Sequence, residues 1–249
     1  MSRLERTHWW YRSTHELVKH CIHKFVGIGS SIFDAGCGTG GLLRMLSSSG
    51  EVSGCDTNYI SVRLARKNLK SVNHSCIQQI DIEELSNLES RTFDCVTCID
   101  VLYHQRVGHW RAALESLKRL LKPRGHLILQ VPAFSALHGS HDVALDGARR
   151  FRRAEIESAL EQSGLITRLC TYRYSHIFFL LLARRFVSRF GRLDRQPISD
   201  FETPCHMPSS LAKRLDQLAL RLARIENLAV LNGAYMPLGS SLFAVARRP

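Results

Sequence analysis

Long hydrophobic runs are scarce in this sequence. The longest stretch of purely apolar residues, 177–183, has seven members, whereas a membrane-spanning helix needs about 20. The first 18 residues are charged and aromatic and contain no apolar stretch of the kind found in secretory signals. These two absences argue against a membrane-spanning or secreted protein and predict a cytoplasmic one.

Paired cysteines are scarce as well. The eight cysteines are scattered, and Cys95 and Cys98 form the one closely spaced pair. No second pair follows, as most zinc sites with this spacing would require, and the segment between them has the composition of a strand. We therefore predict small buried thiols in a reducing compartment. The spacing of the histidines between residues 104 and 141 matches no metal site either, so no metal is expected.

Acidic residues are outnumbered: 34 Lys and Arg face 22 Asp and Glu, for a net charge of +12. Most of the surplus lies in residues 149–249, where 17 basic residues face 8 acidic ones, a balance of +9. Such a surplus can attract nucleic acid, an anionic membrane surface or an acidic substrate, or it can only keep the surface soluble. The chain contains no RNA-binding module and no Asn-Pro-Pro-Tyr motif of base methylation, so a nucleic-acid partner is not expected.

Short apolar segments alternate with helical patterns in the first part of the chain. A helix over residues 4–26 comes first. Strands are then predicted at 30–33, 51–56, 75–80, 94–99 and 126–131, and helices at 42–46, 59–69 and 110–121. This alternation is typical of a parallel sheet built from βαβ units, whose strands are apolar throughout because both faces are buried.

The second part of the chain changes in character. A helix at 153–163, a strand at 165–172 and a final strand at 239–247 enclose an excursion, 174–238. We predict a single domain over 1–249, with residues 1–28 as a helical cover and 174–238 as a helical cap packed on the sheet and covering the substrate. The apolar and then basic segment 177–192 favours a helix on a membrane, a lid over a greasy acceptor, or a buried cap helix.

A leucine stripe marks the last part of this excursion. It begins after a plausible N-cap at Ser209 or Ser210 and repeats at helical spacing. Its members are Leu211, Leu215, Leu218, Leu222 and Ile225. A stripe of this kind is typical of a core-facing helix or a dimer contact, so an oligomer is also considered.

A glycine-rich loop carries the clearest chemistry. Gly36, Gly38 and Gly40 follow an apolar strand and open a helix, where glycines permit sharp turns and free N–H groups face a ligand. The spacing fits two cofactor motifs, GxGxG and the dinucleotide motif GxGxxG. Asp34 favours the first, because a carboxylate suits amines and hydroxyls and would sit badly beside a diphosphate. A turn without any ligand is the structural alternative.

Acidic residues follow three other predicted strands. Asp56 comes about 20 residues after the loop, where a carboxylate can accept bonds from both ribose hydroxyls or cap a helix. Asp81 could accept a bond from an adenine amine while Ile82 packs on the ring, or it could be a solvated turn residue. Asp100 ends the fourth strand of the pattern, next to the expected cleft, or caps that strand end.

Together these motifs resemble class I S-adenosylmethionine-dependent methyltransferases. The resemblance rests on residues 34–40, Asp56, residues 93–104 and residues 120–129, and it covers about residues 5–172 and the last strand. It implies a Rossmann-like α/β fold with a seven-stranded, mostly parallel sheet, an antiparallel last strand and helices on both faces. It also implies S-adenosylmethionine as cofactor and in-line methyl transfer, with Thr57 and Ile99 joining the cofactor-binding residues.

Residues 5–12 resemble the N-terminal helix of one bacterial branch of this family, whose acceptors are small molecules. That resemblance implies that Trp10 covers the cofactor cleft and that Arg12 reaches the methionine carboxylate. An aromatic patch that only docks a helix is the alternative. The chain departs from the branch at 103–104, where an acid usually precedes the histidine, and at 146–147, where a histidine usually recurs.

His104, His141 and Asp142 are the candidate contacts to the acceptor, because each follows the C-terminal end of a predicted strand. A histidine there can take a proton near neutral pH, or it can hold a loop. We expect methyl transfer to an oxygen or nitrogen of a small or lipid-like acceptor. The alternatives are an NAD-type oxidoreductase, an RNA-modifying methyltransferase and a non-catalytic protein of the same fold.

Overall fold

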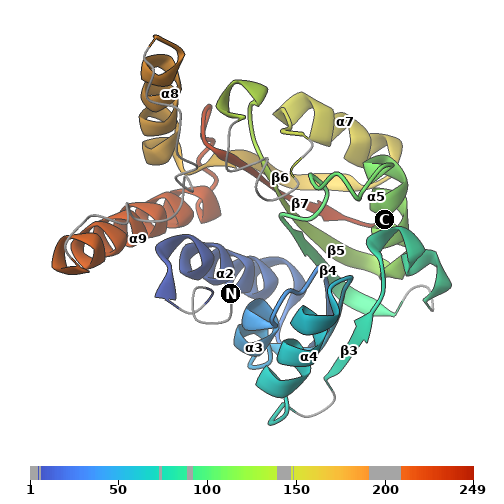
Figure 1. The fold of residues 1–249 in the computed structure, drawn as a ribbon. Helices are drawn as coiled ribbons and strands as arrows, with labels where there is room; N and C mark the ends of the chain where they lie inside the picture. The colour runs from blue at the N-terminus through green and yellow to red at the C-terminus, as the bar shows by residue number, and fades with distance from the viewer. Residues whose placement is uncertain are drawn as a thin grey trace.

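The computed structural model describes residues 5, 7–72, 75–88, 92–138, 147, 149–190 and 209–249. Figure 1 shows one twisted sheet in the middle of the molecule, with helices on both of its faces. The strands lie in the order β3-β2-β1-β4-β5-β7-β6. Their bounds are β1 Ser30–Ala35, β2 Gly50–Asp56, β3 Cys76–Gln79, β4 Phe93–Ile99, β5 Leu121–Pro132, β6 Ile166–Arg173 and β7 Ser241–Arg247.

The strand directions confirm the predicted fold class. Strands β1 to β5 pair in parallel, and β7 runs antiparallel to both of its neighbours, β5 and β6. This sheet is the seven-stranded Rossmann-like sheet of class I methyltransferases. Because the chain reverses between β3 and β4 to start the second half next to β1, the C-terminal ends of β1 and β4 lie side by side, where open sheets of this kind bind ligands.

The helices match the predicted order with shifted ends. Their bounds are α2 Trp9–Cys21, α3 Gly41–Leu46, α4 Tyr59–Asn68, α5 Trp110–Leu120, α7 Arg153–Gln162, α8 Ser175–Phe190 and α9 Ser209–Leu231, with short turns η1 Ile22–Val26, η2 Ile82–Asn87 and η3 Ser135–Leu137. The predicted helix 4–26 is therefore divided: α2 passes into the wider π-turn η1, which stops at Gly27 with a φ of +110°.

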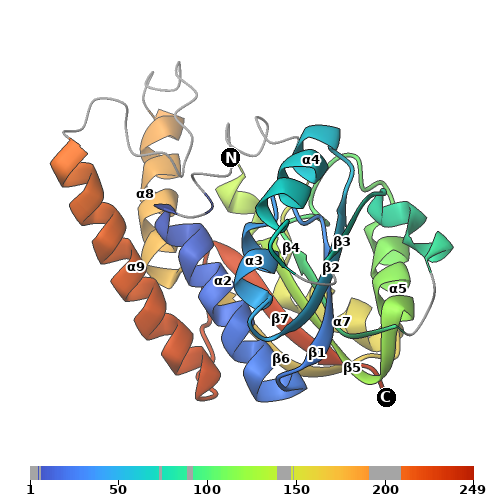
Figure 2. The same ribbon diagram turned by 90° about the horizontal axis from the view of Figure 1, so that it is seen from below.

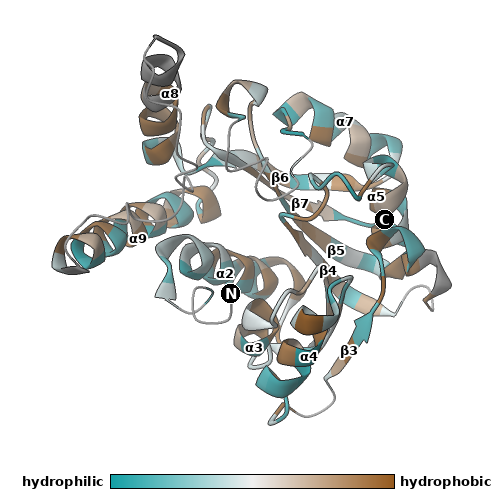
Figure 3. Cartoon of the chain, viewed as in Figure 1, coloured by the Kyte–Doolittle hydropathy of each residue, from teal (hydrophilic) through white to brown (hydrophobic). Residues whose placement is uncertain are grey.

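Two hydrophobic clusters cover the two faces of the sheet. In β5, Leu127 and Leu129 belong to the cluster under α5 and α7, and Ile128 between them belongs to the cluster under α2, α3 and α4. Successive side chains of a strand point to opposite faces, so a strand buried on both sides is apolar throughout. Figure 3 shows the contrast with the helices, many of which combine teal and brown residues.

The prediction of small buried thiols is confirmed for six of the seven described cysteines and is wrong for Cys76 in β3, which is exposed. Cys95 and Cys98 are free and buried in β4. Burial raises the pKa of the Cys95 thiol above its ordinary value, so it stays protonated and behaves as a small apolar group. Cys205 lies outside the described residues.

Helix α9 places its leucine stripe differently from the prediction. The five stripe residues are 40–64% exposed, while Leu220, Ala223 and Val230 are buried. The reading of the stripe as core of this chain is therefore wrong. The cause is that α9 packs along the N-terminal helix α2 through its other face, as Figure 2 shows.

A polar junction fixes α9 and α2 to the end of β6. The buried Arg173 guanidinium donates to Gln130 Oε1 at 2.6 Å and to Asn227 Oδ1 at 2.8 Å. Asn227 Nδ2 donates in turn to the Ser13 carbonyl in α2. The neighbouring Tyr174 hydroxyl contacts Thr14 Oγ1 at 2.6 Å, so residues far apart in sequence hold one another in place.

Among the described residues, none of the helices is long and apolar enough to cross a bilayer.

Candidate cofactor site

The glycine loop joins the end of β1 to α3. Gly36, Gly38 and Gly40 have φ values of +80°, +54° and +82°, a region in which side chains with a Cβ are strained. Gly36 has a second reason to be glycine, because a Cβ there would lie 2.3 Å from Cγ2 of Val101 in the loop after β4. The three predicted glycines thus let two strand ends approach each other closely.

Asp56 lies beside this loop, as predicted. Its Oδ2 accepts the Gly38 N–H at 2.9 Å, and its Oδ1 accepts the Asn58 N–H at 2.8 Å. The helix-capping alternative is not realised by Asp56, since the side chain of Asn58 caps α4. Each carboxylate oxygen still has a lone pair for a further donor, so a fixed Asp56 can accept two ligand hydroxyls.

Two buried carboxyls end the neighbouring strands. Asp34 in β1 accepts the Thr97 hydroxyl at 2.6 Å, and burial together with the charges of Asp56 and Glu5 raises its pKa to about 7. Asp100 follows β4 with a φ of +53° and accepts from Gln130 Nε2 at 2.9 Å. Burial raises its pKa to about 7 as well. A nearby cation would favour the charged form of both groups.

Sequence reasoning missed the role of Glu5. Its Oε2 accepts the Thr39 hydroxyl at 2.7 Å and the Gly41 N–H at 3.1 Å, and its Oε1 accepts the Thr39 N–H at 3.4 Å. The loop therefore presents three donors that bind a carboxylate. Glu5 stands five residues before Trp10 in the N-terminal motif, and that proximity was the only signal in the sequence.

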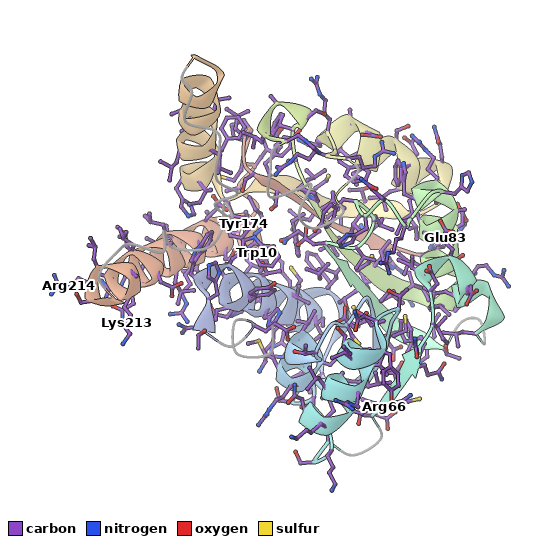
Figure 4. All side chains as sticks on the ribbon, viewed as in Figure 1. Trp10, Arg66, Glu83, Tyr174, Lys213 and Arg214 are labelled. Atoms are coloured by element: carbon purple, nitrogen blue, oxygen red, sulfur yellow. The ribbon has the colours of Figure 1, made fainter. Side chains whose placement is uncertain are left out.

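The N-terminal helix α2 brings further aromatic groups to this edge. Tyr11 lies near Glu5 and Asp100. Its burial and the charges of these two acids raise the pKa of its hydroxyl to about 12. The ring of Trp10 stacks edge-on against Tyr11 with centroids 4.9 Å apart, and Figure 4 shows Trp10 close to Tyr174. Arg12 is half-buried on the same helix. The loop donors contact Glu5, so the contact of Arg12 with a methionine carboxylate stays a prediction.

The remaining predicted cofactor residues lie around the loop with more ordinary roles. Asp81 caps η2 by accepting the Glu83 N–H at 3.0 Å, and Ile82 is buried in the core. The Thr57 carbonyl accepts from Gln79 Nε2, and Ile99 is partly buried at the end of β4. The structure thus gives Asp81 the capping bond of a turn residue, and its carboxylate remains beside Asp56 and Cys55, on whose thiol its charge acts.

Of the three candidate contacts to the acceptor, only His104 lies among the residues that the structure describes. His104 lies in the turn after β4, with its ring 4.2 Å from that of Tyr103, and it forms an isolated bridge with Gly147. His141 and Asp142 lie outside the described residues. The part of the chain that the structure describes contains no cluster of His, Cys, Asp and Glu that could hold a metal ion.

Comparisons with known proteins agree with this geometry. Residues 33–129 match a family described as "Methyltransferase domain". A ubiquinone biosynthesis O-methyltransferase of Alkalilimnicola ehrlichii is 38% identical over 103 residues, which are 40% of each chain. The corresponding enzyme of Pasteurella multocida is 32% identical over 47% of this chain and 56% of its own. The chain thus spans about half or less of the length of these curated relatives.

Solved structures resemble the whole fold. The first is the putative methyltransferase of Haloferax volcanii solved in complex with the Trm112 methyltransferase activator, with 21% identity, a TM-score of 0.62 and coverage of 100% of this chain and 92% of that one. A putative sarcosine dimethylglycine methyltransferase from Galdieria sulphuraria follows, with 14% identity, a TM-score of 0.61 and coverage of 96% and 86%. At these identities the likeness concerns the fold.

Proposed function

We propose that this chain transfers a methyl group from S-adenosylmethionine to a small or lipid-like acceptor, because its sheet has the strand order of class I methyltransferases and its residues 33–129 match a methyltransferase family. The names of the curated relatives, which are O-methyltransferases, favour oxygen over nitrogen as the methylated atom. The class of acceptor is proposed by analogy with these relatives.

The residues at the glycine loop fit this cofactor. One observation carries the proposal: the loop donors hold a carboxylate, that of Glu5. S-adenosylmethionine has a carboxylate too, at its amino-acid end. Asp56 would hold the ribose hydroxyls, and Asp34 and Asp100 would face the positive charge. A diphosphate would meet these carboxylates unfavourably at short range, which argues against a nicotinamide dinucleotide.

The chemistry asks little of the protein beyond placement. The cofactor supplies a methyl group already activated by a sulfonium. An oxygen or nitrogen lone pair of the acceptor would take this methyl group, the sulfur would keep the electron pair of the carbon–sulfur bond, and the acceptor's proton would pass to a base or to water. The chain must therefore align the acceptor and exclude water from the cleft.

We assign the acceptor side of the cleft to His104, His141 and Asp142. His104 supports this assignment by its place after β4, next to the end where Asp100 lies. Replacing His104 by Gln would lower kcat more than it weakens cofactor binding if the ring takes the acceptor's proton. An unchanged kcat in this variant would leave His104 with a loop-holding role.

Calorimetric titration separates the two cofactor classes. We expect saturable binding of S-adenosylhomocysteine and none of NAD. Transfer of a labelled methyl group to hydroxylated aromatic and long-chain acceptors, scored for O- and N-methyl products, then tests the reaction. Binding of NAD alone would contradict the proposal.

We also propose that α8 and α9 contact an anionic membrane that carries the acceptor. Phe179, Leu180 and Leu182 of α8 are 41–65% exposed, alongside the leucine stripe of α9. On α9 the basic residues Lys213 and Arg214 project outward, as Figure 4 shows. The two acids of this helix point inward instead: Asp216 accepts the Trp9 N–H, and Glu226 accepts the Tyr174 and Ser175 N–H groups.

This arrangement matches a helix that lies in a lipid headgroup layer, with apolar residues beside positive ones. Arg214 and Arg221 are exposed on α9, and anionic headgroups would neutralise them; a second copy of the chain is the alternative. Vesicle flotation tests the idea with the double variant L218S/L222S and with I60S, an exposed isoleucine on α4, as control. We expect binding to anionic vesicles that only the double variant loses; dimerisation through the stripe instead would contradict it.

A further inference from the structure

A basic cavity lies at the edge of the sheet opposite the glycine loop. It has a volume of about 470 Å³ and is lined by Lys24, Phe25, Arg124, His126, Arg168 and Arg247. These residues come from η1 and from the ends of β5, β6 and β7 where the parallel strands begin. The glycine loop follows the other end of β1, so the cavity is separate from the cofactor site.

The pairing of three strands brings these side chains together. His126 of β5 lies opposite Arg247 of β7, which in turn lies opposite Ile166 at the start of β6. Arg168 follows two residues later, where the pairing of β6 with β7 shifts register. Arg124 holds a φ of +68° near the start of β5, a conformation that costs an ordinary side chain about 1 kcal/mol.

Four cations, Lys24, Arg124, Arg168 and Arg247, line this cavity. Some exposed cations of the chain have carboxylate partners, as Lys122 has in Asp94 and Arg224 has in Glu16. Within the described residues no carboxylate forms an ion pair with Arg124, Arg168 or Arg247.

His126 lies among these positive charges. Its ring is 8% exposed, and its pKa is lowered by burial and then by the positive charges of Arg247 and Arg168. A neutral imidazole beside these arginines can donate one hydrogen bond to a ligand oxygen. The ring of Phe25, with its centroid 6.1 Å from that of His126, adds an apolar wall.

We propose that this basic cavity binds a small ligand with at least two phosphate groups. Guanidinium groups recognise phosphate oxygens in paired, planar fashion, and three of them here come from three different segments around one hollow. The volume lies within the range of about 300–1,000 Å³ that small-molecule sites occupy. The four cations of the lining, Lys24, Arg124, Arg168 and Arg247, carry a charge of about +4, which two phosphate groups balance more closely than one does.

The ligand would sit apart from the methyl-transfer chemistry and would add a second binding function to the chain. Its affinity would depend on salt, because the contacts are charged and partly open to solvent. It would not compete with S-adenosylhomocysteine, since the two sites lie at opposite ends of the strands.

Calorimetric titration with inorganic pyrophosphate tests the proposal, in the presence of saturating S-adenosylhomocysteine. We expect saturable binding to the wild-type chain and a loss of about tenfold or more in affinity in both R168Q and R247Q. The matched control is R63Q, which removes an exposed arginine from α4 and should bind pyrophosphate as the wild type does. Far-UV circular dichroism and S-adenosylhomocysteine binding of the two cavity variants confirm that they fold.

Three outcomes would overturn this site. They are the absence of saturable pyrophosphate binding at 100 mM salt or less, an equal loss in R63Q, and displacement of pyrophosphate by S-adenosylhomocysteine. A short RNA that binds more tightly than pyrophosphate through the same two arginines would also overturn it, because the surface would then belong to a nucleic-acid backbone. Failure of S-adenosylhomocysteine to bind, with pyrophosphate binding intact, would count against the proposed function alone.

Discussion

Helix α9 and the central sheet bury opposite kinds of residue. The strands β1, β4 and β5 fill both faces of the sheet with apolar side chains, whereas α9 turns its leucine stripe outward and buries Glu226 and Asn227, besides Leu220, against α2 and β6. Apolar burial is non-directional, but buried polar groups must find hydrogen-bond partners of the right geometry. The sheet is thus stabilised mainly by the apolar area that it buries, and α9 mainly by specific hydrogen bonds.

The sheet and the α9 junction also contribute differently to the candidate cofactor site. The sheet places Asp34, Asp56 and Asp100 at its edge with capacity left for a ligand. The junction of α9, α2 and β6 holds the helix that carries Trp10 and Tyr11 over the same edge. Rigidity of the cover therefore depends on bonds made far from the glycine loop.

The sharpest way to test the α9 junction is to remove its buried arginine. Arg173→Ala would leave the Gln130 and Asn227 oxygens without their donor and would open a cavity, so we expect unfolding free energy to fall by about 3 kcal/mol or more. Urea denaturation measures the change, with Arg63→Ala as an exposed control expected within about 0.5 kcal/mol of wild type. A loss in Arg173→Ala no larger than in this control would show that area holds α9 too.

The corresponding change at the sheet edge is Asp56→Ala, which should act on ligand binding. It removes the acceptor expected for the ribose hydroxyls, where each charge-assisted bond contributes roughly 1.5–3 kcal/mol, and we expect S-adenosylhomocysteine affinity to fall about tenfold to a hundredfold. Asp56→Asn keeps one acceptor and should lose less. Titration calorimetry that gives equal affinities for wild type and Asp56→Ala would remove Asp56 from the site.

The raised pKa of Asp34 predicts how stability depends on pH. A carboxyl whose pKa rises from 3.8 in the unfolded chain to about 7 in the folded one binds its proton more tightly when folded. Its contribution is complete below about pH 4 and is lost as pH rises to 7. Relative to Asp34→Asn, the wild type should therefore become less stable from pH 4.5 to 7.5, as thermal melts would reveal; parallel profiles for the two proteins would contradict this.

The same pKa value predicts proton release when a cationic ligand binds near Asp34. At pH 6 the protonated carboxyl would ionise beside a sulfonium. S-adenosylmethionine binding should thus release more protons than binding of the uncharged thioether S-adenosylhomocysteine, which calorimetry in buffers of different ionisation enthalpy measures. Equal release by both ligands would place the sulfonium away from Asp34.

The smallest expected effect distinguishes the two faces of α9 directly. Leu218 is 53% exposed and Leu220 is 4% exposed, so Leu218→Ala should change the unfolding free energy by no more than about 0.5 kcal/mol. Leu220→Ala should cost about 2 kcal/mol or more. Similar losses for both, measured by urea denaturation, would show that the leucine stripe is covered in solution.

Much of the fold could be predicted because its signals are local. Apolar runs separated by helical patterns predicted the strands of a parallel sheet, and glycine spacing with Asp34 and Asp56 predicted the loop. Positive φ values are possible for few residues other than glycine, so Gly36, Gly38 and Gly40 indicate their own backbone conformation. The antiparallel last strand followed from the family resemblance, which the sheet order confirms.

Tertiary structure alone decided where α9 lies, what Glu5 contacts and how the basic cavity forms. A leucine stripe predicts an apolar face but not which surface covers it, and here the bonds of Arg173, Asn227 and Glu226 turned that face outward. Arg124, Arg168 and Arg247 are separated by up to 123 positions in the chain and meet only through strand register. The sequence determined the elements because their causes lie within a few residues; their partners depended on contacts between distant residues, which no local pattern contains.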